Sequence, residues 1–199
     1  NLSYRQKAQV ESYRNSGFKV QNLNYITESR LAIGLGNASA LEVDLTLHPI
    51  YGIPYIPSTS IKGMLRAWAE QVEKNESEEL LKLFGSENKF KSDSEMALGS
   101  LRFLDVFPAQ WPKLELDIMT PHYGDYYSDS DGKTPPADWL DPNPIHFLTV
   151  QAGIPFRFIV AAKSKEELLN AKRFLDMGLE YLGLGAKTSS GYGYFESGE

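Results

Sequence analysis

The feature that most constrains this chain is a glycine-rich loop near the end of its sequence. Residues 183–195 read GLGAKTSSGYGYF, between a helix-like apolar segment and a strand-like aromatic end. Glycine lets the backbone reach positive φ and approach a ligand closely, and successive free N–H groups form a concave anion site. Lys187 adds a positive charge, and hydroxyls such as that of Thr188 can donate to phosphate oxygens. The loop therefore predicts a phosphate site. The alternative is a turn in which Gly183 closes a helix.

A second segment predicts another phosphate contact. Ser58, Thr59 and Ser60 are good N-cap residues, and the apolar spacing that follows predicts a helix from residue 61. Lys62 and Arg66 lie one turn apart near the start of this helix. Exposed N–H groups and the helix dipole favour an anion there and disfavour a cation. Two cations at this place therefore indicate a bound anion, with simple solvation as the alternative.

Composition narrows the classes of protein to consider. A chain of 199 residues suits one domain with insertions. It has no cysteine, which excludes disulfides and thiolate metal sites and fits a reducing, cytoplasmic location. No apolar run is long enough to span a membrane. The net charge of −6 argues against a broad basic face. Any phosphate contact must therefore be local, made by loops and helix ends.

The order of predicted elements indicates an α+β fold. We expect strands in 30–47, 98–106 and 114–118, a hairpin over 144–162, and a final strand at 192–195. Ser164 and Glu167 form a capping box that opens the last long helix. This pattern predicts a ferredoxin-like (RRM-like) βαββαβ domain, with helices on one face of an antiparallel sheet plus loop insertions. Residues 1–29, with a short helix at 2–14, are expected to be an N-terminal extension. The single domain is expected to span 30–199.

Residues 120–144 form an irregular insertion or arm. A segment this long without periodicity is functional, disordered or packed on a partner. Aromatic residues among small polar ones suit base stacking or a protein contact. The candidate contact residues of this arm are His122, Tyr123, Tyr126, Tyr127 and Trp139.

An alternating pattern over residues 41–48 places Asp44 and His48 on one face of a strand. A solvated outer face is the simplest interpretation. An acid/base or metal cluster is the alternative. Nothing nearby supplies a third ligand at a convincing spacing, so we predict no metal and no cofactor.

The two phosphate-binding segments resemble a known family. Residues 56–66 (IPSTSIKGMLR) are similar to the I-P-G-S-S-L-K-G-x-L-R motif of RAMP proteins in CRISPR effector complexes, with Ser58 where the family usually has Gly. Residues 183–193 resemble the signature glycine-rich loop of these proteins. Residues 117–123 and 142–147 resemble the sixth subunits of the Cmr (type III-B) complex.

The resemblance implies a ferredoxin-like subunit that holds the backbone of a guide RNA without cutting it, near the guide 3′ end. Its implied partners are guide RNA (crRNA), with target RNA as a further candidate, and other Cmr subunits, with no membrane. Backbone contact suits a guide of variable sequence. By match, the RNA-binding residues are Ser60, Lys62, Gly63, Arg66, Gly183, Gly185, Lys187 and Thr188.

Two enzymatic alternatives are also considered from the motifs. Residues 43–47 keep the Asp of the V-D-x-P-I segment with which a sister subunit cuts RNA, but lack its Pro. The alternative is therefore a metal-dependent ribonuclease that uses Asp44 with His48. A nucleotide or penicillin-binding enzyme fits poorly. Ala186 stands where a Walker motif needs Gly, and Ser189 stands where Lys-Thr-Gly needs Gly.

Overall fold

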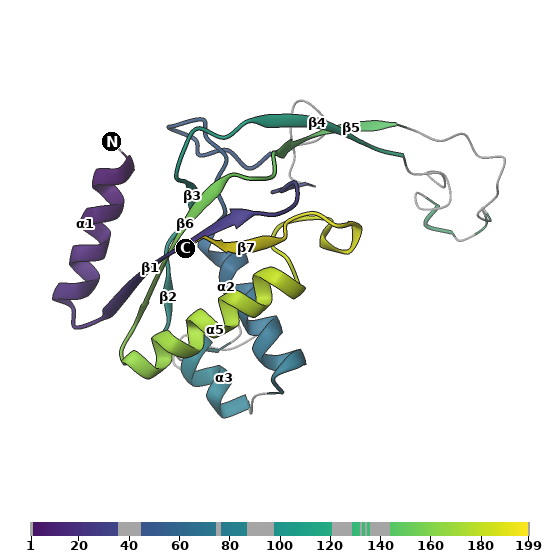
Figure 1. Ribbon diagram of the computed structural model, residues 1–199. Coiled ribbons are helices and arrows are strands. Elements are labelled where there is room, and N and C mark those ends of the chain that lie inside the picture. The colour runs from purple at the N-terminus through teal and green to yellow at the C-terminus, as the bar shows by residue number, and fades with distance from the viewer. Residues whose placement is uncertain are drawn as a thin grey trace.

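The fold is built on one antiparallel sheet. The computed structural model describes residues 2–35, 45–74, 77–86, 98–120, 129–131, 133, 135 and 144–198. Its main sheet has the strand order β2-β6-β1-β7, and β3 also pairs with β6 (Figure 1). Every neighbouring pair is antiparallel. The bounds are Lys19–Thr27 (β1), Arg102–Phe103 (β2), Phe107–Pro108 (β3), Pro155–Ala162 (β6) and Phe195–Gly198 (β7).

Two helices cover one face of this sheet. Helix α2 (Ser58–Ala67) lies between β1 and β2 in the chain, and α5 (Lys165–Tyr181) lies between β6 and β7. Both contribute to one apolar core with the inward side chains of the strands. They approach closely, because a Cβ on Gly178 of α5 would lie 2.2 Å from Sδ of Met64. The mixed α+β class with an antiparallel sheet agrees with the prediction.

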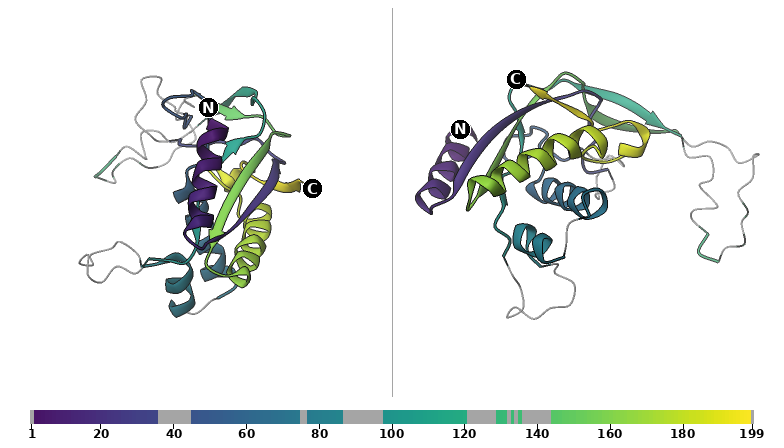
Figure 2. Two further views of the ribbon diagram at one scale, coloured as in Figure 1. Left: turned by 90° about the vertical axis from the view of Figure 1, so that its left-hand side faces the viewer. Right: turned by 60° about the horizontal axis from the view of Figure 1, so that its bottom comes forward.

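Helix α1 (Leu2–Asn15) packs on the other face of the sheet (Figure 2). Its Val10 forms a small cluster with Leu104 and with Ile159 of β6. Ile159 points away from its neighbours Phe158 and Val160, which lie in the main core, as expected for successive strand residues. The sheet therefore lies between α1 and the α2–α5 layer.

Strand β1 corrects the expected domain boundary. It lies between β6 and β7, inside the segment expected to be an extension. The core face of β1 includes the buried Tyr25 and Thr27, whereas its other face carries Asn22 and Asn24. Because a single helix covers that second face, polar residues interrupt the strand and weaken its hydrophobic signal. Residues 19–27 are thus a central part of the sheet.

The first helix of the main layer begins differently from the prediction. Pro57 is the N-cap residue, and it makes no side-chain cap hydrogen bond of its own. Ser58 is already helical and does not have positive φ, so a serine at this position costs no backbone strain. A π-helical turn (Trp68–Val72) follows α2, and α3 (Ser77–Phe84) ends at Gly85, whose φ is 79°.

A second, two-stranded sheet extends from the molecule. Strands β4 (Leu114–Met119) and β5 (Ile145–Val150) pair along their whole length. The predicted hairpin over 144–162 is therefore wrong in its pairing, because β5 pairs with β4 while β6 pairs with β1, β2 and β3. Thr27 contributes to this separation. Its hydroxyl accepts the N–H of Ile154 and lies within hydrogen-bonding distance of the Gln151 carbonyl, which fixes the link between β5 and β6.

Other predicted strands are shorter than expected. Within 98–106 only Arg102–Phe103 is a strand, and the final strand begins at Phe195. The described part of 30–47 forms only isolated bridges, such as Leu31 with Val150 and Leu47 with Pro54. Among the helices of the described ranges, none is long and apolar enough to cross a membrane.

Candidate functional site

The glycine-rich loop is tied to the segment that follows β1. The N–H of Gly193 donates to the Arg30 carbonyl at 2.9 Å, and the N–H of Ala186 donates to the Ala32 carbonyl at 2.8 Å. The N–H of Leu184 donates across the loop to Gly193. These bonds use N–H groups that the sequence analysis assigned to an anion. Those of residues 187–189, at the start of a 3-10 turn (Thr188–Ser190), are not used in these bonds.

The loop needs glycine mainly because it packs against its own chain. Gly185 has φ of 102°, and a Cβ there would lie 2.4 Å from the Ala32 carbonyl oxygen. A Cβ on Gly193 would lie 2.0 Å from the Leu184 carbonyl oxygen. A close approach of this loop to a ligand stays a prediction. At Gly185 and Gly193 the structure shows a close contact with the chain's own backbone, whereas Gly191 faces open space.

Lys187 has a strained backbone conformation. Its φ and ψ are 60° and 33°, in the left-handed region, which is unfavourable for a residue with a Cβ. Its Nζ lies 5.8 Å from the centre of the Phe147 ring on β5. Because glycine would adopt this backbone with less strain, a lysine here supports a role for the ammonium group.

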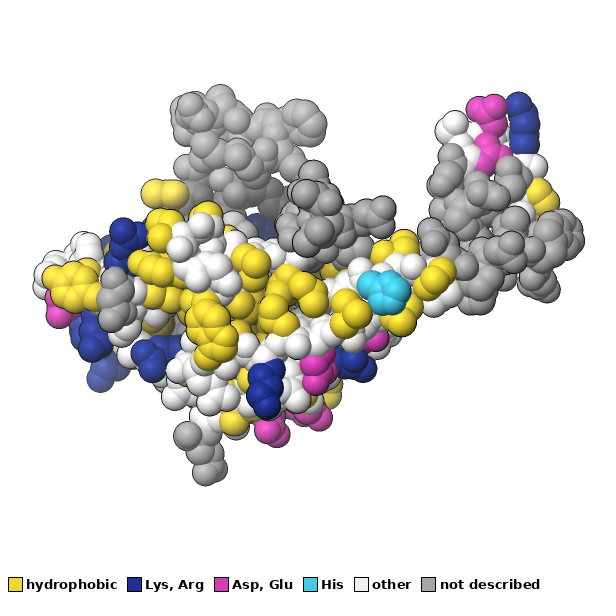
Figure 3. Space-filling view, turned by 90° about the horizontal axis from the view of Figure 1, so that it is seen from above, with side chains coloured by type: hydrophobic (Ala, Val, Ile, Leu, Met, Phe, Trp, Pro, Cys, Tyr) yellow, Lys and Arg dark blue, Asp and Glu magenta, His cyan; other side chains and the backbone are white. Residues whose placement is uncertain are grey.

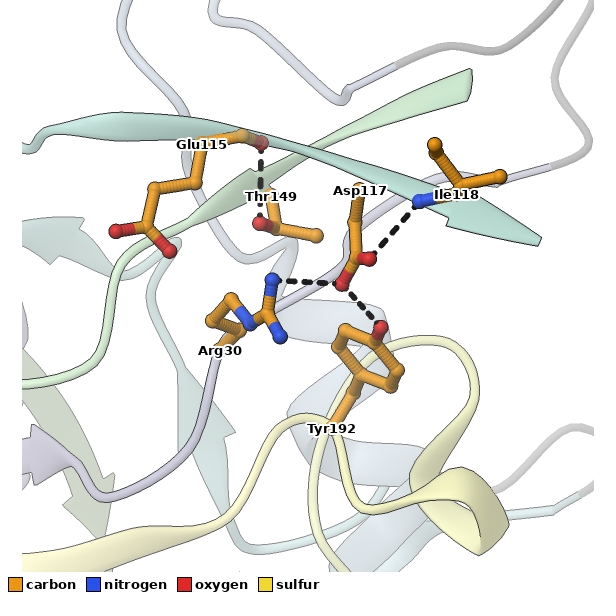
Figure 4. A network of polar contacts seen from close by, with 6 residues as sticks. All are labelled: Arg30, Glu115, Asp117, Ile118, Thr149 and Tyr192. Carbon is orange, nitrogen blue, oxygen red and sulfur yellow. Dashed lines mark hydrogen bonds and ion pairs between the residues drawn. The ribbon is translucent and has the colours of Figure 1, made fainter. Parts of the chain in front are cut away.

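A polar network joins the glycine-rich loop to β4 (Figure 4). Tyr192 donates its hydroxyl hydrogen to the carboxylate of Asp117, and Nη1 of Arg30 lies 2.8 Å from Oδ2 of the same carboxylate. The N–H of Ile118 donates to the other carboxylate oxygen at 2.8 Å. Two residue pairs along the ribbon, the Thr149 hydroxyl donates to the Glu115 carbonyl.

This network lowers the pKa of Asp117. The largest cause is the hydrogen bond from Tyr192, with further lowering from the Ile118 N–H and the Arg30 charge, against a smaller opposing effect of desolvation. The same hydrogen bond raises the pKa of Tyr192. Arg30, Asp117 and Tyr192 were not predicted as site residues. The available signal was that Asp117 and Tyr192 lie in two segments, 117–123 and 183–193, that resemble the family.

The second predicted segment borders a cavity of about 430 Å³. Ser58, Thr59 and Lys62 line it from α2, and Arg102 lines it from β2. Burial lowers the pKa of Lys62, and the positive charges of Arg66 and Arg102 lower it further. An anion in this cavity would relieve that repulsion between cations.

The start of α2 holds an anionic group from the protein itself. The N–H of Ser58 donates to the Asp105 carboxylate at 2.8 Å, and the N–H of Ser60 donates to the Pro57 carbonyl at 3.0 Å. Ser60 is thus in the first turn and is not a cap. A Cβ added at Gly63 would meet nothing within 4 Å, so this side of the helix is open.

Arg66 has a structural contact. Its Nη1 donates to the Gly85 carbonyl at 3.2 Å, at the end of α3. A cation is favourable at a helix C-terminus, where carbonyl groups lack helical partners. At least one of its donors therefore serves the packing of α3 against α2.

The two segments have different surroundings. Lys62 lies with Arg102 beside α3 and β2, whereas Lys187 lies over Phe147 of the ribbon. Within the described ranges, these two sets of neighbours share no residue. We therefore keep the two segments as separate candidate phosphate contacts.

The remaining candidate residues lie partly outside the described residues. Asp44 and all five candidate residues of the arm, from His122 to Trp139, lie outside the described residues. His48 is described, and its ring lies 4.7 Å from Tyr51, 5.8 Å from Tyr55 and 5.7 Å from Phe107. No group of three metal-ligating side chains occurs among the residues that the structure describes.

Comparison with known proteins identifies the family. A family model described as the RAMP superfamily matches residues 24–196. The chain belongs to the RAMP superfamily. The matched range begins within β1, which agrees with the central place of this strand in the RAMP sheet.

Two curated RAMP relatives carry the name of the subunit that the sequence resembled. "CRISPR system Cmr subunit Cmr6" of Pyrococcus furiosus is 32% identical over 84% of this chain and 65% of its own length. The protein of the same name from Saccharolobus solfataricus is 29% identical over 94% of this chain and 61% of its own length. The resemblance to sixth subunits is confirmed. This chain spans just under two thirds of the length of these relatives.

Two solved structures have a similar fold. A chain in the cryo-EM structure of the type III-B Cmr-beta bound to cognate target RNA matches with a TM-score of 0.77 and 25% identity. That match covers 100% of this chain and 65% of the other. The crystal structure of Cmr6 from Pyrococcus furiosus matches with a TM-score of 0.54 and 31% identity, over 92% of this chain and 99% of the other.

Proposed function

We propose that this chain is a non-catalytic RNA-binding subunit of a type III-B CRISPR (Cmr) complex that targets RNA. It holds the sugar-phosphate backbone of the guide RNA near its 3′ end and packs on sister subunits in the cytoplasm. Support comes from the curated relatives named Cmr6 and from the structural match to a chain of an RNA-bound Cmr complex.

The observation that carries the RNA proposal is the cationic cavity at the start of α2. Lys62 is crowded there by Arg66 and Arg102. None of the described residues that line the cavity is acidic, although the whole chain has a net charge of −6. A local cluster of cations in an acidic protein favours a polyanion bound at that place. Contact through phosphate leaves the base sequence of the guide free to vary.

Lys187 supplies the second backbone contact in this proposal. Three consecutive N–H groups beside it, those of residues 187–189, take no part in the internal backbone bonds of the loop. Successive N–H groups beside an ammonium group suit a phosphate. The ring of Phe147 beside Nζ limits the positions that the ammonium group adopts.

The proposed core of the subunit is a ferredoxin-like βαββαβ unit. Its elements in chain order are β1, α2, β2, β6, α5 and β7. The sheet order β2-β6-β1-β7 makes each helix the crossover between two parallel strands separated by one antiparallel strand. On this assignment α1, α3, β3 and the β4–β5 ribbon are additions to the unit.

The β4–β5 ribbon supports packing on a sister subunit. One face of β4 exposes Leu114, Leu116 and Ile118, with exposed fractions of 44%, 62% and 52%. Figure 3 shows apolar side chains along this ribbon, with a histidine among them. An exposed apolar strip on an extended ribbon is typical of a protein interface. We place a neighbouring Cmr subunit there.

The proposed subunit does not cut RNA. The ribonuclease alternative requires Asp44, which lies outside the described residues, together with His48. The ring of His48 is surrounded by three aromatic rings, and its Nδ1 accepts the Ile50 N–H at 3.2 Å. These surroundings favour a binding role for His48.

Purification of the tagged chain from its host, followed by sequencing of the bound RNA, tests the function. We expect other Cmr subunits and short RNAs that share a constant 5′ segment. An unrelated protein with the same tag controls for RNA that sticks to the column. Recovery of the chain without RNA and without partner subunits would refute the proposal.

A further inference from the structure

A second cavity lies beside the cationic one, on the α1 side of Ser58. Its volume is about 260 Å³, and it lies between α1, the 48–58 segment and the strands β2 and β3. Ser58 and Phe103 line both cavities. The two are therefore neighbours on either side of the first turn of α2. The residues that give the second cavity its chemistry are Arg5, Gln9, Tyr13, His48, Tyr51 and Asp105.

The aromatic part of this cavity is held in place from behind. The rings of His48 and Tyr51 are 4.7 Å apart and tilted by 39°. Phe107, which is buried, lies 5.7 Å from His48 and stacks on Tyr55 at the same distance. Rings fixed in this way lose little conformational entropy when a planar group stacks on them.

The polar part offers both donors and acceptors. Nδ1 of His48 accepts the Ile50 N–H, which leaves Nε2 as the nitrogen that can donate to a ligand. Asp105 is fixed by two contacts, since its carboxylate accepts the Ser58 N–H and its carbonyl accepts from Gln6. Arg5 and Gln9 of α1 add a guanidinium and an amide.

The size of the cavity limits its occupant. It lies just below the range of about 300–1,000 Å³ that is typical for drug-sized ligands. One planar ring system with a polar edge fits such a space better than a larger molecule. Stacking on aromatic rings with hydrogen bonds to the edge is how proteins bind unpaired nucleobases.

We propose that the cavity lined by His48, Tyr51 and Arg5 binds one unpaired nucleobase of an RNA strand whose neighbouring phosphate lies at Lys62. The inference rests on the proposed function for the phosphate contact and adds a base contact to it. The bound base would fix the register of the RNA strand, because it holds one nucleotide beside Ser58 while the RNA backbone lies at α2.

Binding of this chain to two oligomers tests this inference. One is a single-stranded oligouridylate, and the other is the ribose-phosphate oligomer of equal length without bases. We expect Tyr51→Ala to weaken binding of the oligouridylate about 5- to 100-fold and to leave binding of the abasic oligomer unchanged. Tyr51→Phe keeps the ring and should retain most of the affinity. Tyr4→Ala, on an exposed ring of α1 outside the cavity, is the matched control.

The outcomes separate the inference from the proposed function. Lys62→Ala should weaken binding of both oligomers. If it does and Tyr51→Ala has no effect, or has an equal effect on both oligomers, the base site is refuted while the backbone site stands. If neither variant weakens binding, both are refuted.

Crosslinking of the unmodified protein provides a second measurement that does not depend on how a variant folds. We expect 4-thiouridine in the bound oligomer to crosslink to peptides that contain residues 5–13 or 48–51. Crosslinks confined to other peptides would overturn the base site.

Discussion

Tyr192 and Asp117 join two parts of the molecule that lie 75 residues apart in sequence. Tyr192 belongs to the glycine-rich loop, and Asp117 belongs to β4 of the ribbon. Lys187 of the same loop contacts Phe147 on the partner strand β5. The loop thus holds both strands of the ribbon. A two-stranded ribbon is marginally stable alone, so we conclude that these contacts help to fix its position.

Removal of the Asp117 charge should lower stability in a pH-dependent way. Because the folded state lowers the pKa of Asp117, its contribution is present above the unfolded value of about 3.9 and is lost as pH falls through the folded value. We expect Asp117→Asn to cost about 1 kcal/mol at pH 7, since the network is partly exposed. The measurement is denaturant unfolding of both proteins between pH 7 and pH 3.

The difference between the two proteins should shrink below about pH 4. Tyr192→Phe keeps the ring beside Phe147 and removes only the hydroxyl donor. In a Tyr192→Phe background, Asp117→Asn should therefore cost less stability than in the unmodified protein. A difference that stays constant over the whole pH range would contradict the assigned charge interaction.

Alanine at Gly185 should be strongly destabilising. The added Cβ would lie 2.4 Å from a backbone oxygen, and φ is 102°. We expect a loss of more than about 2 kcal/mol in the free energy of unfolding. Gly191→Ala is the control, because Gly191 has φ of 90° but no atom within 4 Å of the added Cβ. It should cost about 1 kcal/mol. Equal losses at both sites would refute the packing explanation.

Alanine at Gly63 should have opposite effects on stability and on RNA binding. Gly63 lies inside α2, and its Cβ position is open. The substitution should stabilise the helix by up to about 1 kcal/mol, because alanine has the higher helix propensity. It should also weaken RNA binding, because the methyl group occupies the side of α2 next to Lys62. Unchanged RNA affinity in a stabilised variant would show that the sugar-phosphate backbone of the RNA does not approach Gly63.

Local signals explain which elements the sequence predicted well. The capping box of Ser164 and Glu167 is present as predicted. Such signals act over a few residues and do not depend on the rest of the fold. The strands β5 and β6 were also located, yet alternation does not specify a partner strand, so their pairing was wrong.

Interactions between distant segments explain what the sequence missed. Strand β1 was overlooked because its polar Asn22 and Asn24 face the side covered only by α1. The network of Arg30, Asp117 and Tyr192 needs three segments that only the tertiary fold brings together. The glycines of the loop were recognised, but their reason, a close contact with residues 32 and 184, depends on how the loop packs.

The most direct test of the central claim is the RNA affinity of the double variant Lys62→Ala/Lys187→Ala, measured at several salt concentrations. Lys19→Ala/Lys165→Ala removes the same charge from exposed lysines at the starts of β1 and α5 and is the control. We predict that the first pair lowers the RNA affinity at least tenfold. It should also reduce the slope of log affinity against log salt concentration by the amount expected for about two phosphate contacts, whereas the control pair should change the affinity and the slope little. Equal affinity and an equal salt slope for the two double variants would contradict the account.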